Sequence, residues 1–492
     1  MTDTGRSGWR SHPLDDDSLH EECGVYGVFG TDAAAAYVAL GLHALQHRGQ
    51  EAAGICSYSP DTGFNTVRRI GYVRDNFTKP SVMDLLPGRL AMGHTRYSTA
   101  GAKSETALRD VQPLYADFAM GGCAVAHNGN ITNAEALRAQ LIERGSIFQS
   151  TSDTECIIHL MARSIQKTIP DRMKDALRLV EGAFSVIAMT RTKIIGVRDP
   201  LGVRPLVLGR FGDAWILSSE TCALDILGAE LVREIAPGEM VIITDKGVES
   251  HHPFEPERPR FCVFEYVYFS RPDSMIGGLS VYEVRRRIGM ELAREAPADA
   301  DIVCPIPDSG TPAAIGYSQE SGLPFTMGII RNQYVGRTFI EPTEQIRNMG
   351  VRLKLNVNRA VVEGKRVVLV DDSVVRGTTS RKIKDMILAA GAAEVHFRIA
   401  SPPTRWPCFY GVDTPEQDKL LASAMSEDEM CRHLGFDSLR FVSLDGLYRA
   451  AGQAAGRDKA SPQFCDACFS GDYPIEPSDA RARGRLKEAV GA

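Results

Sequence analysis

The chain has 492 residues, of which 43% are hydrophobic and 24% are charged, an ordinary composition for a globular protein. This length favours about two to three domains. A formal net charge of −6 offers no electrostatic case for binding nucleic acid or an anionic membrane surface. No apolar run is long enough to span a bilayer, and the first residues lack the apolar core of a secretory signal. We therefore expect a cytoplasmic protein whose eleven cysteines are thiols, catalytic groups or metal ligands rather than disulfides.

The first half of the chain shows short strands and a few helices. Residues 1–22 are polar and acidic, which predicts a disordered segment. From Cys23 the run C-G-V-Y-G-V-F-G alternates as a strand does. Helices are expected at 33–46, 133–144 and 153–166, and further strands at 183–189 and 214–218. Three prolines within 251–259 favour a domain boundary there.

The second half alternates strands with helices, which predicts a parallel sheet covered on both faces. Strands are expected at 302–306 and 367–370, and helices at 281–296 and 380–390. The segment 461–477 contains proline and glycine and shows no helical periodicity.

Five short clusters in the first half occur in a characteristic order. They are Cys23-Gly24-Val25-Tyr26-Gly27, His47-Arg48-Gly49-Gln50-Glu51, His94-Thr95-Arg96-Tyr97-Ser98-Thr99, His127-Asn128-Gly129-Asn130 and Ser152-Asp153-Thr154-Glu155. Each alone has an ordinary explanation: Asn-Gly favours a turn, a cysteine in an apolar strand packs in a core, Arg96 makes a surface ion pair, and Asp153 caps a helix. Together, over about residues 23–248, they resemble the glutaminase domain of class II amidotransferases. The resemblance implies an α+β N-terminal-nucleophile hydrolase, an αββα sandwich.

The chemistry of glutamine hydrolysis accounts for these residue types. It requires a nucleophile, and a thiolate is a good one. Members of the family use the α-amino group of the cysteine as the base, and its unperturbed pKa of about 8 lies close to working pH. The resemblance therefore implies that residues 1–22 are a propeptide cut before Cys23. It assigns the glutamine carboxylate to Arg96, the glutamine ammonium to Asp153, and the oxyanion hole to the Asn128 side chain and the Gly129 N–H.

The second half contains the run R-V-V-L-V-D-D-S-V-V-R-G-T-T-S over residues 366–380. An apolar strand is followed there by two acids and a loop rich in small residues. Ligands of open parallel sheets bind at the carboxyl ends of strands, and backbone N–H groups at a helix start favour a phosphate. A bare acidic pair would suggest only a capped turn. The full run resembles the phosphoribosyl pyrophosphate (PRPP) motif of type I phosphoribosyltransferases, which implies an α/β domain with a parallel sheet.

This resemblance also implies roles for individual residues. The ribose hydroxyls of PRPP would lie on Asp371 and Asp372. Its 5′-phosphate would lie on the loop formed by Ser373, Arg376, Gly377, Thr378 and Thr379. Ile306-Pro307-Asp308-Ser309-Gly310 resembles the pyrophosphate loop, and Ser309, Asp371 and Asp372 are the expected site of one Mg²⁺ per subunit. The basic segment 331–354 is either a solvated loop or a lid that excludes water.

A cysteine glutaminase followed by a PRPP-binding half resembles the family of glutamine PRPP amidotransferases. The resemblance implies a propeptide (1–22), a glutaminase domain (23–257) and a transferase domain (258–492). The expected substrates are glutamine and PRPP, and the expected products are 5-phosphoribosylamine, glutamate and pyrophosphate, in the first step of purine (IMP) synthesis. The family is commonly tetrameric and inhibited by purine nucleotides (AMP, GMP, ADP, GDP).

The sequence disfavours two other kinds of protein. Another class II amidotransferase would carry sugar-isomerase domains or an ATP loop in the second half, and neither pattern is found. A non-catalytic purine sensor would bind nucleotide at a decayed PRPP site, but the motifs around Cys23 and Asp371 are intact.

Four cysteines suggest a metal centre. Cys465-Asp466-Ala467-Cys468 is a C-x-x-C, which alone is a weak signal. Cys262, in F-C-V-F-E-Y-V-Y-F-S-R-P-D-S, and Cys408, in W-P-C-F-Y-G-V-D, lie in sequences similar to the iron–sulfur subfamily of this family. By that resemblance Cys262, Cys408, Cys465 and Cys468 bind one [4Fe–4S] cluster per subunit, with a four-cysteine zinc site as the alternative. Six other cysteines are expected to be buried thiols: Cys56, Cys123, Cys156, Cys222, Cys304 and Cys431.

Overall fold

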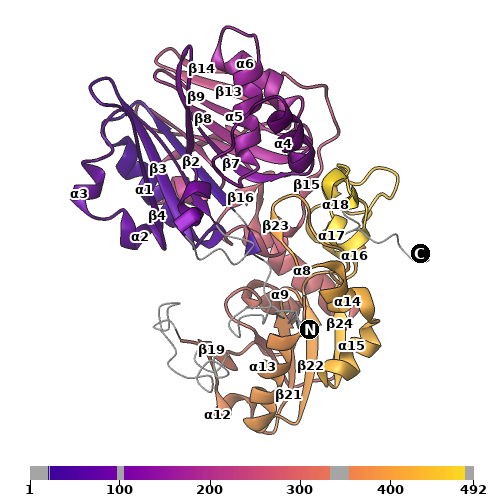
Figure 1. Cartoon of the computed structure of the whole chain (residues 1–492). Helices are drawn as coiled ribbons and strands as arrows, with labels where there is room; N and C mark the ends of the chain where they lie inside the picture. Colours follow the sequence, from indigo (N-terminus) through magenta and orange to yellow (C-terminus); the bar gives the residue numbers. More distant parts are fainter. Residues whose placement is uncertain (1–19, 22, 97–104, 333–353, 483–492) are drawn as a thin grey trace, which may run out of the picture. The chain divides into compact units, whose positions relative to one another are not determined.

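The structure is a computed structural model that describes residues 20–21, 23–96, 105–332 and 354–482 (Figure 1). The described residues form two compact units. The two-sheet unit takes its residues from 19–284, 405–417 and 457–492. The parallel-sheet unit takes its residues mainly from 285–404 and 418–456.

Two antiparallel sheets form the centre of the two-sheet unit. Among the described residues, the first sheet has the strand order β12 (Glu230–Glu234), β10 (Val207–Phe211), β11 (Ala214–Ser218), β2 (Cys23–Phe29), β5 (Leu90–Arg96), β3 (Ala52–Ser59) and β4 (Gly63–Ile70). The second has the order β14 (Gly247–His251), β13 (Met240–Thr244), β9 (Ile194–Arg198), β8 (Gly182–Met189), β7 (Gly121–Ile131) and β6 (Leu114–Phe118).

The inner faces of these sheets share one core, to which Val25, Met92, Ala126, Ile187 and Leu217 belong. Helix α1 (Ala34–Ala44) packs with the outer face of the first sheet. Helices α4 (Ala134–Glu143), α5 (Thr154–Arg163) and α6 (Ile169–Leu177) cover the second. Because both faces of each sheet are covered, all seven residues of β2 are buried. This arrangement confirms the predicted αββα sandwich.

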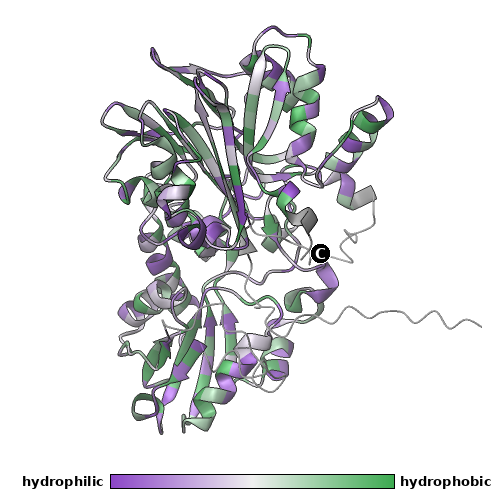
Figure 2. Ribbon diagram, turned by 60° about the vertical axis from the view of Figure 1, so that its left-hand side comes forward, coloured by the Kyte–Doolittle hydropathy of each residue, from purple (hydrophilic) through white to green (hydrophobic). Residues whose placement is uncertain are grey.

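The parallel-sheet unit has the strand order β18 (Ile302–Pro305), β21 (Arg366–Asp371), β22 (Glu394–Ile399) and β24 (Ser438–Phe441), with each described pair parallel. Its core includes Val367, Leu369, Ile383, Ile387 and Phe397. Helices α8 (Val281–Glu295), α9 (Thr311–Ser321), α13 (Thr378–Ala389), α15 (Glu427–Leu434) and α16 (Leu444–Ala450) alternate with the strands. Hydrophobic residues mark the strands of both units (green in Figure 2). The predicted parallel sheet is confirmed.

Short elements complete the described fold. In the two-sheet unit they are β1 (His20–Glu21), η1 (Gln46–Arg48), α2 (Val73–Asn76), α3 (Pro80–Met83), η2 (Glu105–Asp110), α7 (Cys222–Asp225), β15 (Phe261–Cys262), η3 (Glu265–Phe269), β16 (Met275–Ile276), β17 (Leu279–Ser280), β23 (Val412–Asp413), η4 (Gln417–Lys419, at the unit boundary), β25 (Phe464–Cys465), α17 (Ala467–Ser470) and α18 (Ser478–Ala482). In the parallel-sheet unit they are β19 (Ile329–Arg331), β20 (Leu355–Val357), α12 (Arg359–Val362) and α14 (Leu421–Ala424).

Two of these elements differ from the sequence-based expectation. His20–Glu21, within the segment expected to be disordered, pairs with Val412–Asp413 as an antiparallel strand. Strand β15 pairs with β25 near the end of the chain, so the last described residues belong to the two-sheet unit. Both strands lie within the range 258–492 predicted for the transferase domain, yet their contacts place them in the two-sheet unit, because hydrogen bonding between distant segments does not follow chain order. No described helix combines the length and the apolar character needed to cross a membrane.

Candidate functional site

Cys23 is the first residue of β2, and its register partner on the neighbouring strand β5 is Arg96. Cys23 is only 8% exposed. The guanidinium Nη2 of Arg96 lies 3.6 Å from Asp110 Oδ2, and the Arg96 side chain is 22% exposed. Gly49 lies against the same strand, and a Cβ there would be 2.6 Å from the Arg96 backbone nitrogen. The motifs that contain Cys23 and Gly49 thus meet the motif that contains Arg96 at the end of β5. Residues 97–99 of the Arg96 motif lie outside the described residues.

The H-N-G-N motif lies inside strand β7 rather than in a turn. Gly129 has φ of +139°, and a Cβ there would lie 2.0 Å from the Ala183 carbonyl oxygen, so only glycine fits. Asn128 is 1% exposed, and its amide nitrogen lies 3.4 Å from Ser219 Oγ. The Ser219 hydroxyl also accepts a hydrogen bond from the Val25 N–H at 3.0 Å. Ser219, which lies in none of the five sequence motifs, therefore joins the strand of the cysteine to the strand of the expected oxyanion hole.

Asp153 lies at the first turn of α5, directed at the end of β7. Its Oδ2 accepts a hydrogen bond from the Ile131 N–H at 3.0 Å and lies 3.7 Å from His127 Nδ1. Burial opposes ionisation of this carboxyl, but attraction to His127 and hydrogen bonds from His127, Ile131 and Thr154 hold the pKa of Asp153 below its ordinary value. The carboxylate is 22% exposed, so it can reach a cationic ligand. His127 is the first residue of the H-N-G-N motif, but the sequence did not indicate its interaction with Asp153.

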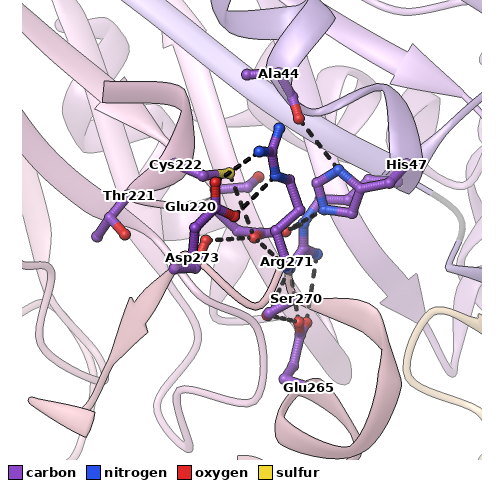
Figure 3. A network of polar contacts seen from close by, with 12 residues as sticks. Ala44, His47, Glu220, Thr221, Cys222, Glu265, Ser270, Arg271 and Asp273 are labelled. Carbon is purple, nitrogen blue, oxygen red and sulfur yellow. Dashed lines mark hydrogen bonds and ion pairs between the residues drawn. The ribbon is translucent and has the colours of Figure 1, made fainter. Parts of the chain in front are cut away.

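A network of charged side chains connects η1, the segment after β11 and η3 (Figure 3). Arg48 donates to Glu220 through Nε and to Glu265 through Nη2, the latter at 2.6 Å. Arg204 Nη1 donates to Glu265 Oε1 at 3.1 Å, and His47 Nε2 lies 2.7 Å from Glu220 Oε1. Burial disfavours the charged form of Glu220, yet the charges of Arg48 and His47 hold its pKa well below the ordinary value. Arg48, the arginine of the H-R-G-Q-E motif, thus makes buried ion pairs with Glu220 and Glu265. The sequence alone indicated a role for neither glutamate.

In the parallel-sheet unit, Asp371 is the last residue of β21 and Asp372 follows it. Asp372 is buried, and its backbone N–H donates to Asp371 Oδ1 at 2.9 Å. Ser373 Oγ donates to Asp372 Oδ1 at 2.6 Å. Gly377, with φ of +75°, is the residue before α13, so the loop 373–377 leads directly into a helix N-terminus. This is the geometry expected of a phosphate site.

The loop 306–310 packs against the same strand end. Ile306 N–H donates to the Val370 carbonyl at 2.8 Å, and a Cβ on Gly310 would lie 2.4 Å from that carbonyl oxygen. Ser309 is therefore held at the carboxyl edge of the sheet, as Asp371 is. Asp308 forms an ion pair with Arg331. Of the predicted lid, Arg331 and Lys354 lie at the base of the β19–β20 ribbon, and residues 333–353 lie outside the described residues.

The four predicted cluster cysteines line one cavity, together with Phe264, Tyr410 and Tyr473. Cys262 and Cys465 are register partners in the β15–β25 pair. The Tyr410 N–H lies 3.3 Å from Cys408 Sγ, and the Arg405 and Trp406 N–H groups donate to the Cys468 carbonyl at 3.0 and 3.1 Å. Burial raises the pKa of Cys262 to about 12, so without a cation its thiol is neutral.

Within the described ranges no three His, Cys, Asp or Glu side chains are spaced to hold a single metal ion. Of the six remaining cysteines, five are buried as expected, whereas Cys431, beside the turn at Gly435, is only partly buried.

Comparisons with known proteins agree with both units. Residues 94–225 match the family model of a glutamine amidotransferase domain. The chain is 57% identical to the amidophosphoribosyltransferase of Rhizobium etli, over 95% of this chain and 94% of that one. It is 45% identical to the amidophosphoribosyltransferase of Bacillus subtilis, over 96% and 98%.

Two solved structures have the same fold over almost the whole chain. One is glutamine PRPP amidotransferase from B. subtilis complexed with ADP and GMP, with a TM-score of 0.86, 45% identity, and coverage of 92% of this chain and 98% of that one. The other is described as the allosteric regulatory enzyme of purine biosynthesis, with a TM-score of 0.88, 45% identity, and coverage of 95% and 99%. Identity of this extent, carried by both units, shows that the chain belongs to the amidophosphoribosyltransferase family, the enzymes that use glutamine to aminate PRPP in the first step of purine biosynthesis.

Proposed function

We propose that Cys23 hydrolyses glutamine in the two-sheet unit and that Asp371 and Asp372 hold PRPP for amination in the parallel-sheet unit. One observation carries the first assignment: Cys23 and Arg96 are register partners on adjacent strands. A nucleophile and a carboxylate-binding guanidinium are thereby held in fixed relation on a buried sheet.

In the glutaminase reaction the Cys23 thiolate attacks the amide carbon of glutamine, and the carbonyl oxygen becomes an oxyanion. Asn128 and the Gly129 N–H are the proposed donors to it. The amide nitrogen of Asn128 makes only a long contact of 3.4 Å with Ser219, and an oxyanion offers it a stronger, charge-assisted partner. Arg96 binds the glutamine carboxylate and Asp153 its ammonium. Collapse of the oxyanion breaks the carbon–nitrogen bond, and the leaving nitrogen takes a proton from the Cys23 α-amino group and departs as ammonia, which leaves a thioester on Cys23. Water then hydrolyses this thioester and releases glutamate and the free thiol.

In the transferase reaction ammonia forms a bond to the anomeric carbon of PRPP as the bond to pyrophosphate breaks. Asp371 and Asp372 bind the ribose hydroxyls and stabilise the positive charge that develops on the ring. The residues Ser373, Arg376, Gly377, Thr378 and Thr379 hold the 5′-phosphate at the start of α13. Ser309, Asp371 and Asp372 fit Mg²⁺ by the hard oxygen donors they offer, and the ion, when bound, offsets the charge of pyrophosphate.

The α-amino group of Cys23 can serve as base only after residues 1–22 are removed, and this processing is part of the proposal. The complex of the B. subtilis enzyme with ADP and GMP supports inhibition by AMP, GMP, ADP or GDP. A homotetramer and a cytoplasmic location stay predictions from the sequence resemblance.

The cavity lined by Cys262, Cys408, Cys465 and Cys468 supports a [4Fe–4S] cluster. Four cysteine thiolates are the donor set that such a cluster requires, and these four residues would hold it. Bound iron, or zinc in the alternative, would also lower the cost of ionising thiols that burial keeps neutral. The metal centre would pin the segments around residues 262, 408 and 465 to one another.

The variant Cys23→Ala tests the division of labour. Glutamine-dependent synthesis of 5-phosphoribosylamine should disappear, while synthesis from free ammonium should persist because the parallel-sheet unit needs only ammonia. Mass analysis of the active wild-type enzyme should find Cys23 at the N-terminus. An active enzyme that retains residues 1–22, or a variant that still uses glutamine, would overturn the assignment of Cys23.

A further inference from the structure

The predicted oxyanion strand is in direct backbone contact with the loop 408–411, which begins at one of the cluster cysteines. Gly411 has φ of +100°, and a Cβ there would lie 2.9 Å from Gly129 Cα, 3.0 Å from its carbonyl carbon and 3.2 Å from its carbonyl oxygen. Two glycines of segments 282 positions apart therefore meet without any side chain between them. A close approach of this kind leaves no room for either segment to move toward the other.

A hydrogen bond fixes the same contact one residue along. The Asn130 side-chain amide donates to the Phe409 carbonyl at 2.9 Å. The two interactions, Gly129 with Gly411 and Asn130 with Phe409, run side by side, so the loop meets consecutive residues of β7. Together they set both the distance and the direction between loop and strand.

The loop also contacts the buried charge network, through the backbone carbonyl of Tyr410. Tyr410 is 1% exposed, and its carbonyl accepts a hydrogen bond from Arg204 Nε at 2.8 Å. Arg204 in turn is held by Glu265, and its own carbonyl accepts from Ser185 Oγ at 3.2 Å. Ser185 is the register partner of Asn128 in the β7–β8 pair. The loop is therefore part of the interior, joined directly to β7 and, through Arg204, to the neighbouring strand β8.

We propose that the loop 408–411 positions the oxyanion hole, with Gly411 and the Phe409 carbonyl holding Gly129 and Asn130 in place. The proposal rests on the oxyanion role assigned above to Asn128 and Gly129. These donors act on a charge that develops in the transition state and is absent from bound glutamine, so a shift of Gly129 lowers kcat for glutamine hydrolysis. The KM for glutamine depends on Arg96 and Asp153 and changes little. Gly411 and Asn130 are positioning residues, since neither is proposed to touch substrate.

Gly411→Ala is the direct test, because its new methyl group must displace Gly129. Loss of a whole oxyanion donor costs about 10²–10³ in kcat, so a displaced donor should cost about ten- to a hundredfold. The KM for glutamine should stay within about threefold, and ammonia-dependent synthesis should equal that of the wild type. Gly247→Ala is the matched control: Gly247 has φ of +112° in the same unit, but a Cβ there meets nothing within 4 Å. It carries the same backbone strain without the contact and should leave glutaminase kcat unchanged.

Asn130→Ala and Asn130→Asp test the contact without added volume. Alanine removes the donor, and aspartate keeps the shape but sets an acceptor against the Phe409 carbonyl, so the aspartate variant should lose more kcat. Iron and zinc content of each purified variant should match the wild type. The proposal is wrong if Gly411→Ala behaves as Gly247→Ala does, if KM rises while kcat holds, or if kcat falls only in preparations that have lost metal. Asn128→Ala separates the two hypotheses: full kcat in that variant would reject the oxyanion role itself, whereas its loss beside a normal Gly411→Ala would reject only the role of the loop.

Discussion

Arg48 and Glu265 form an ion pair in which both side chains are fully buried, with Nη2 lying 2.6 Å from Oε2. Glu265 is also the partner of Arg204, so one carboxylate serves two buried guanidinium groups. Glu265→Ala would leave both positive charges without this partner in the interior. We expect the variant to lose about 3–5 kcal/mol in free energy of unfolding, measured by urea denaturation.

The exposed pair Arg271–Asp273 is the matched control for that experiment. Its nitrogen–oxygen distance is also 2.6 Å, but the two side chains are 42% and 52% exposed. Water already solvates these charges, so Asp273→Ala should cost less than about 1 kcal/mol. Equal losses from the two variants would contradict the importance of burial.

Neutralising the acidic pair of the parallel-sheet unit should affect both nitrogen sources. Asp371→Asn and Asp372→Asn remove charges proposed to stabilise the ribose in the transition state, so each should lower ammonia- and glutamine-dependent synthesis by about 10²-fold or more. Asp385→Asn, on the exposed face of α13 where its carboxyl is 61% exposed, should leave both rates unchanged. Full ammonia-dependent activity in either variant of the pair would show that the ribose assignment is wrong.

The cysteine cavity predicts a coloured protein. Anaerobic preparations should be brown and contain about four iron and four sulfide per chain. Cys465→Ser should lower the iron content, because it removes one ligand from the cavity, whereas Cys431→Ser, in the other unit, should not. A colourless and fully active anaerobic preparation with stoichiometric zinc would favour the four-cysteine zinc site instead.

His94 predicts an acid-dependent loss of stability. Burial, reinforced by the positive charges of Arg96 and His127, lowers the pKa of His94 to about 3 from an ordinary 6.5. Below pH 6.5 the unfolded chain binds a proton at this residue that the folded chain does not, until the pH approaches 3. Stability is therefore lost as the pH falls through this window, by up to about 1.4 kcal/mol per pH unit.

Replacing the imidazole checks this linkage. His94→Leu and His94→Gln should both flatten the pH dependence of the unfolding free energy between pH 4 and 6.5 relative to the wild type, whatever their effects on packing at pH 8. Parallel curves for the wild type and both variants would show that His94 does not contribute. Comparing the curves removes the contribution of titrating groups that do not interact with His94.

Features set by neighbouring residues were predictable from the sequence. The apolar runs of β2 and β21 are strands, and the periodic segments at α4, α5 and α13 are helices within a few residues of the expected bounds. Glycine followed by threonines after an acidic pair indicated a phosphate loop, and the loop leads into a helix as expected. These features depend on side-chain periodicity and local hydrogen bonding, which a chain segment contains in itself.

Only the tertiary structure determined which distant segments lie in contact. Asn128-Gly129 favours a turn locally, but its ladder with β8 and packing on both faces keep it in strand β7. The pairing of Arg48 with Glu265 joins residues 217 positions apart, and the contact of Gly411 with Gly129 depends on two backbones fitting in space. Neither a buried ion pair nor a close backbone contact can be recognised from neighbouring residues in the sequence. Both depend on burial, which only the complete fold creates.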